Sequence, residues 1–111
     1  MTQHDPLDLK ANERARADRE IRARLSRESE ESDVRWLMGT KRGRRIVWRL
    51  LDRAGVFRST FSQNSMQMAF NEGSRNYGLA LLASVHALCA EQYPAMMKEA
   101  TDDDRNTDTP D

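Results

Sequence analysis

The stretch Lys41–Arg58, KRGRRIVWRLLDRAGVFR, separates arginine from aliphatic side chains and decides the expected fold class. At about 100° per residue, four arginines fall within an arc of roughly 80° of a helix: Arg42, Arg45, Arg49 and Arg53. The opposite side of that helix carries Ile46, Val47, Leu50, Leu51 and Ala54. This pattern predicts an amphipathic helix whose aliphatic face is buried and whose other face presents guanidinium groups.

Local signals place the ends of this helix at about Lys41 and Ala54. Thr40 is a suitable N-cap, and Gly55 is a suitable C-cap glycine. Gly39 ends a short preceding helix over Val34–Met38. The arginine helix therefore lies between two helix-terminating glycines.

The segment before it predicts a separate polar helix. Leu9–Arg27 is rich in good helix formers, but its apolar stripe consists only of Ala17, Ile21 and Leu25. The charged cluster Arg27–Ser32 interrupts this pattern. We therefore expect a helix that is exposed or ordered only on a partner.

The segment after it predicts a long helix from Met66 to about Gln92, capped by Asn64 or Ser65. A final short helix is expected over Ala95–Ala100, with Pro94 in its first turn. No stretch alternates apolar and polar residues as a half-buried strand does.

The predicted fold class is therefore all-α: a small domain of three to four helices with one long C-terminal helix, flanked by polar flexible termini. Residues 1–30 form a polar Arg-rich segment that is partly helical or disordered, and residues 31–100 form the helical domain. Residues 101–111 hold five aspartates and no apolar side chain, which predicts a disordered acidic tail.

The zero net charge hides a strong asymmetry along the chain. Residues 1–60 carry 15 basic and 10 acidic side chains, whereas residues 61–111 carry 3 and 8. Arg35–Arg58 alone holds 8 basic residues against Asp52. Such a local field attracts polyanions. Nucleic acid, an acidic protein partner, a merely solvated face and the acidic tail lying across the basic helix remain alternative interpretations.

The long helix predicts a helix–helix interface. Its candidate interface residues are Phe70, Gly73, Tyr77, Gly78, Leu81, Leu82, Val85 and Leu88. Each glycine inside a helix costs about 1 kcal/mol relative to alanine, so we expect a tight helix crossing at these positions. Leu79, Leu82 and Cys89 occupy an arc that is polar in the preceding turns, and they need cover from the fold or from another subunit.

Catalytic and metal-binding chemistry is not predicted. His4, His86 and the single Cys89 lack the further ligands that a metal site needs, and no phosphate-binding loop or nucleophile elbow occurs. The longest apolar run, Leu79–Ala90, is too short to span a bilayer, and no signal peptide opens the chain. We expect no enzyme activity, no cofactor, no metal, no small-molecule substrate and no membrane partner.

The order of residues from Phe57 onward resembles a family of small tailed-bacteriophage proteins whose genes typically lie in the virion-morphogenesis region. The resemblance covers about residues 33–100, and its segments are Phe57–Phe61, Asn64-Ser65, Phe70–Leu79, Leu81-Leu82 and Tyr93–Glu99. It implies a phage structural or assembly role and no catalytic residue.

The leading functional hypothesis is a non-enzymatic phage structural or assembly protein. It would act through helix–helix contacts with itself or with a portal, head or tail component. It would be found in the host bacterial cytoplasm during assembly, and the virion is the other expected location. The alternative hypothesis is a small nucleic-acid-binding protein that uses the arginine helix.

Overall fold

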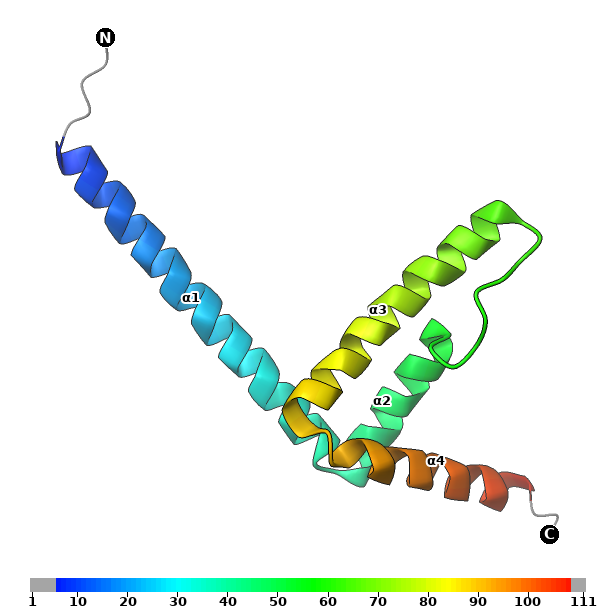
Figure 1. The fold of residues 1–111 in the computed structure, drawn as a ribbon. Coiled ribbons are helices and arrows are strands. Elements are labelled where there is room, and N and C mark those ends of the chain that lie inside the picture. Colours follow the sequence, from blue (N-terminus) through cyan, green and yellow to red (C-terminus); the bar gives the residue numbers. More distant parts are fainter. Residues whose placement is uncertain (1–5, 109–111) are drawn as a thin grey trace. The chain divides into compact units, whose positions relative to one another are not determined.

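The computed structural model describes residues 6–108, and all the regular structure in that range is helical (Figure 1). The helices are α1 (Pro6–Met38), α2 (Lys41–Ala54), α3 (Ser65–Cys89) and α4 (Gln92–Asp108). The all-α prediction is confirmed. The chain divides into two compact units, of which the first ends at Ser32 and the second begins at Asp33.

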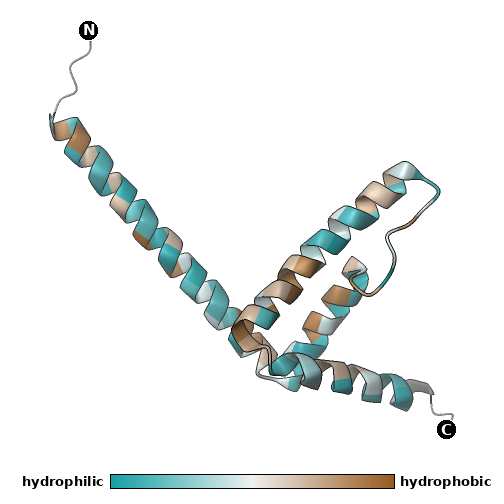
Figure 2. Ribbon diagram, viewed as in Figure 1, coloured by the Kyte–Doolittle hydropathy of each residue, from teal (hydrophilic) through white to brown (hydrophobic). Residues whose placement is uncertain are grey.

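The first unit is the polar part of α1. Its described side chains are exposed apart from a half-buried Ala15, and most of its residues are hydrophilic (Figure 2). The predicted interruption at Arg27–Ser32 is wrong, because α1 runs through it without a break. This segment has neither glycine nor proline, and its arginine and glutamate residues are good helix formers.

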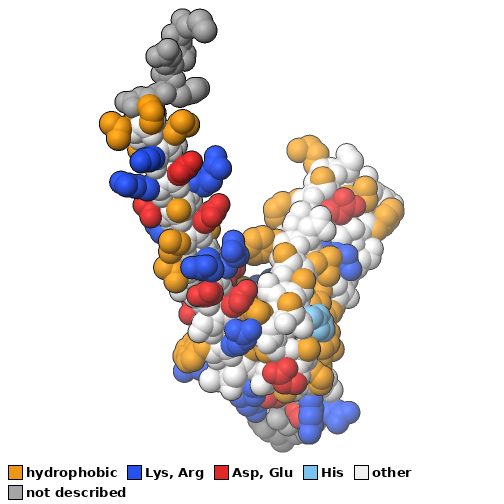
Figure 3. Space-filling view, turned by 60° about the vertical axis from the view of Figure 1, so that its left-hand side comes forward, with side chains coloured by type: hydrophobic (Ala, Val, Ile, Leu, Met, Phe, Trp, Pro, Cys, Tyr) orange, Lys and Arg blue, Asp and Glu red, His pale blue; other side chains and the backbone are white. Residues whose placement is uncertain are grey.

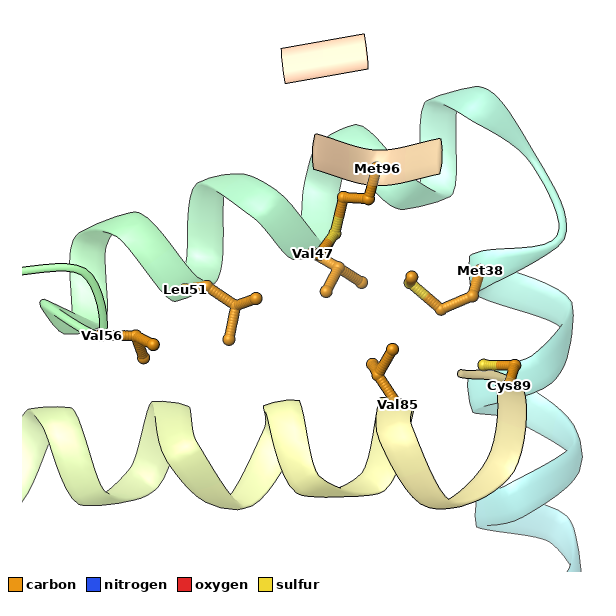
Figure 4. Close-up of a cluster of buried hydrophobic side chains, with 7 residues drawn as sticks. All are labelled: Met38, Val47, Leu51, Val56, Val85, Cys89 and Met96. Carbon is orange, nitrogen blue, oxygen red and sulfur yellow. The ribbon is translucent and has the colours of Figure 1, made fainter. Parts of the chain in front are cut away.

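The second unit holds the hydrophobic core. α2 and α3 run antiparallel, and α4 packs against both of them. Seven side chains converge from all these elements and from the end of α1 (Figure 4): Met38, Val47, Leu51, Val56, Val85, Cys89 and Met96. Every one of these buried residues lies between positions 38 and 96.

Both predicted caps of α2 are confirmed. The Thr40 hydroxyl accepts a hydrogen bond from the Gly43 N–H at 3.0 Å, and Gly55 adopts a left-handed conformation with φ of 82°. Two positions of the predicted buried face are wrong, because Ile46 and Leu50 are exposed. On the helical wheel these two residues lie next to the arginine arc, so α3 and α4 cover only the far part of the aliphatic face.

Two glycines allow close packing in the second unit. A Cβ atom at Gly43 would overlap the backbone carbonyl of Leu37. A Cβ atom at Gly78 would lie 2.7 Å from the Ala54 Cβ, so α3 crosses the end of α2 at the distance that only glycine permits. The expected tight crossing is therefore present at Gly78.

α3 begins after Asn64, whose side chain accepts hydrogen bonds from two backbone N–H groups, as predicted. The second half of α3 is strongly apolar (Figure 2), and the rest of the chain covers part of it. Leu79 and Leu82 pack against the core and Cys89 is buried within it. These residues therefore give no independent evidence for a covering subunit.

α4 is much longer than the predicted helix Ala95–Ala100. It begins at Gln92 and continues to Asp108, so residues 101–108 of the acidic tail are helical rather than disordered. Residues 109–111 of the predicted tail lie outside the described range, as does His4. The extension keeps one helical face of α4 directed at α2.

Candidate functional site

The four predicted binding arginines share one exposed face of α2. Arg42, Arg45, Arg49 and Arg53 are all solvent-exposed. Among the side chains that the structure describes, none of them forms a direct ion pair. The structure thus places these residues together on the surface as the sequence predicted.

A fifth arginine of α2, Arg44, is partly buried rather than exposed, and it was not among the predicted site residues. Its guanidinium pairs with Glu99 of α4, with Nη2 to Oε1 at 2.7 Å and Nε to Oε2 at 2.9 Å. Nη1 also donates to the Met38 carbonyl oxygen at 2.9 Å and to the Gln92 side chain at 3.2 Å. Arg44 therefore joins the end of α1, α2 and α4.

This pair shifts the ionisation of both partners. The hydrogen bond from Arg44 lowers the pKa of Glu99, while partial burial opposes that shift. The same hydrogen bond raises the pKa of Arg44. Arg44 lies on the aliphatic side of the helical wheel, outside the arc of the other four arginines. That position in the sequence already indicates an ion pair, because a cation on a buried face requires a partner.

A groove of about 270 Å³ separates α2 from the acidic half of α4. Its cations are Lys41, Arg45 and Arg49, and its acidic residues are Asp52, Glu99, Asp103 and Asp104. The acidic face of α4 therefore lies along the basic face of α2 within one chain. This geometry matches the alternative in which the acidic tail lies across the basic helix.

The eight residues of the predicted helix–helix interface fall into two groups. Five belong to the chain's own packing: Gly78 and Val85 are buried, and Leu81, Leu82 and Leu88 pack against the core. The other three, Phe70, Gly73 and Tyr77, are exposed. A Cβ atom at Gly73 would meet open space, so the tight crossing expected there does not occur within the chain.

The exposed group forms one apolar face of α3. Its members have the spacing of a single helical face: Met66, Phe70, Gly73 and Tyr77. Met66 is 82% exposed, Phe70 69% and Tyr77 82%. Hydrophobic side chains are visible on the surface of the second unit in the space-filling view (Figure 3). Large apolar patches left uncovered on a surface are typical of interaction sites.

Two aromatic contacts stabilise neighbouring parts of the second unit. Trp48 of α2 stacks on Phe57 with ring centroids 4.8 Å apart. This contact packs the turn after α2 against that helix. His86 of α3 lies against Tyr93 at 4.7 Å, which links the ends of α3 and α4. Both Trp48 and His86 thus have a packing role.

The single thiol lies inside the core rather than at a reactive surface. Burial raises the pKa of Cys89, which disfavours the nucleophilic thiolate. In residues 6–108 we find no group of three metal-ligating side chains. None of the helices in that range is both long and apolar enough to cross a membrane.

Comparison with known families gives a match over the second unit. A family model described as Bbp19-like phage protein matches residues 34–98 of the 111-residue chain. The chain belongs to this family. A search of curated proteins and one of solved structures find no significant match.

Membership of the Bbp19-like family confirms the phage resemblance read from the sequence. The matched region contains α2, α3, the exposed apolar face of α3 and all of the buried core. It leaves out the polar part of α1 and the acidic half of α4.

Proposed function

We propose that this Bbp19-like protein is a non-enzymatic phage structural or assembly protein that binds another helix through the exposed face of α3. The observation that carries the proposal is the group Met66, Phe70 and Tyr77, which the described chain leaves uncovered on one helical face. These side chains surround Gly73, whose bare backbone leaves room for a partner side chain or helix.

The chemistry of this face favours a protein partner. No charged residue stands among Met66, Phe70, Gly73 and Tyr77, and aromatic and methionine side chains are enriched where protein surfaces bind each other. Two classes of partner fit this face: a virion component of the portal, head or tail, and a second copy of this chain. We favour the virion component because the matching family is one of phage proteins.

The proposal is tested by placing a photocrosslinking amino acid at Tyr77 during phage infection. We expect a crosslinked product that mass spectrometry identifies as a phage structural protein. The matched control carries the same amino acid at Leu50, which is also exposed but lies on α2. A crosslink pattern that is the same at both positions would contradict a specific α3 surface.

A second measurement separates the two partner classes. Tyr77→Glu places a charge on the apolar face without touching the core, so it should reduce phage yield while leaving the helical content unchanged. Analytical ultracentrifugation of the wild-type chain then reports self-association. A dimer that Tyr77→Glu converts to a monomer would assign the face to a second copy instead.

A further inference from the structure

A second hollow in the same unit has a different chemical character from the α2–α4 groove. It has a volume of about 310 Å³ and lies between the end of α2, the following turn and the first half of α3. Two arginines line it, Arg53 and Arg58, and no acidic residue does. In the α2–α4 groove, by contrast, aspartate and glutamate outnumber the cations.

The two guanidinium groups retain hydrogen-bonding capacity. Arg53 makes no hydrogen bond or ion pair with any other side chain in the described part of the chain. Arg58 donates through Nη2 to the Asp52 carbonyl oxygen, which positions the group and leaves its other N–H donors available. Paired arginines of this kind bind phosphate oxygens through several N–H donors at once.

Polar side chains complete the wall of this hollow. Ser59, Thr60 and Ser74 contribute hydroxyl groups. The Ser59 Oγ accepts a hydrogen bond from the Phe61 N–H at 3.1 Å, so its own proton remains free to be donated. Neutral hydroxyl donors beside arginine are common partners of nucleic-acid phosphates.

Phe70 also lines the hollow, and it is 69% exposed. An exposed aromatic ring next to a cationic pocket is the arrangement on which unpaired bases stack. We propose that this hollow, the Arg53–Arg58 pocket, binds single-stranded nucleic acid, with a phosphate on the two arginines and a base on Phe70, a ring for which the base and the partner helix proposed above would compete. An acidic peptide would satisfy the arginines but would leave the ring without a stacking partner.

The test measures binding of a fluorescent single-stranded oligothymidylate of about ten nucleotides to the full chain by anisotropy. We expect Arg53→Gln with Arg58→Gln to weaken binding about tenfold or more. The matched control, Arg45→Gln with Arg49→Gln, removes the same charge from the α2–α4 groove, and it should weaken binding less than about threefold. Phe70→Ala keeps every charge and should also weaken binding, by about tenfold.

Further measurements keep the result interpretable if the double variant unfolds. Arg53→Gln alone breaks no hydrogen bond or ion pair within the described chain, and it should weaken binding while preserving the thermal transition. NMR shifts on adding the oligonucleotide to wild type should be largest at Ser59 and Ser74. Equal losses in both double variants, no binding by the wild type, or stronger binding of polyglutamate than of the oligonucleotide would each overturn the proposal.

Discussion

Arg44 and Glu99 lie 55 positions apart in the chain and meet in a bidentate ion pair between α2 and α4. Their side chains are 13% and 23% exposed, so water screens this pair less than a surface pair. Because Arg44 also donates to the Met38 carbonyl oxygen, the pair links α4 to α2 and to the end of α1. Arg44 therefore adds a polar attachment of α4 to the packing of Met96 in the core.

Glu99→Gln should lower the free energy of unfolding by about 1–3 kcal/mol at neutral pH, because it leaves a partly buried guanidinium without its carboxylate. Urea denaturation measures this change. Glu72→Gln is the matched control, since Glu72 is an exposed glutamate of α3. A loss no greater than that of the control would show that the pair contributes nothing to stability.

The same pair predicts a pH dependence with a definite sign. Arg44 lowers the pKa of Glu99 in the folded chain, so the stabilisation is present above the unfolded pKa of glutamate, about 4.3. It is lost as the pH falls through the lower folded value. Wild type and Glu99→Gln should therefore differ at pH about 7 and converge in stronger acid. A difference that persists unchanged into acid would contradict the role assigned to the charge.

The two glycines of α3 give a matched pair of substitutions with opposite signs. Gly73→Ala should stabilise the chain by about 1 kcal/mol, because the new methyl group meets open space and alanine favours the helix. Gly78→Ala should destabilise it by about 1–3 kcal/mol, because the methyl group would lie 2.6 Å from the Val56 Cγ2 and 2.7 Å from the Ala54 Cβ. Thermal and urea denaturation of both variants test the prediction. Equal effects at the two positions would show that the α2–α3 crossing is looser than the structure indicates.

The parts of the fold that the sequence predicted are those encoded by neighbouring residues. Thr40, Gly55 and Asn64 signal helix ends through local hydrogen bonds and backbone conformation, so their roles were readable. The exposure of Arg45 and Arg49 followed from helical periodicity alone. Local chemistry was sufficient in each case.

The features that could not be predicted from the sequence depend on how elements distant in the chain pack together. The sequence could not show that α3 and α4 leave Ile46 and Leu50 uncovered, since the wheel places them on the aliphatic side. It also gave no partner for Arg44, because Glu99 lies on another helix. The split of the predicted α3 interface into buried Val85 and exposed Tyr77 has the same origin.

Removal of residues 1–32 should leave the second unit folded. The core residues all lie between Met38 and Met96, and the polar part of α1 contributes none of them. We expect the melting temperature of the shortened chain to change by only a few degrees, about what a 1 kcal/mol effect produces in a small domain. Circular dichroism measures this transition. Loss of cooperative unfolding would show that the polar part of α1 is needed for folding.

Two truncations within α4 should affect stability differently. A chain that ends at Ala100 retains Met96, which is 1% exposed, and the Glu99 carboxylate, so it should unfold cooperatively with nearly wild-type stability. A chain that ends at Pro94 loses both, and removal of a buried methionine side chain alone costs about 2–5 kcal/mol. The shorter chain should therefore be largely unfolded.

The chain that ends at Ala100 should also elute from heparin at a higher salt concentration than wild type, because Asp103 and Asp104 no longer lie beside Arg45 and Arg49. Heparin elution that does not change after truncation at Ala100 would show that the acidic half of α4 does not screen the arginine face.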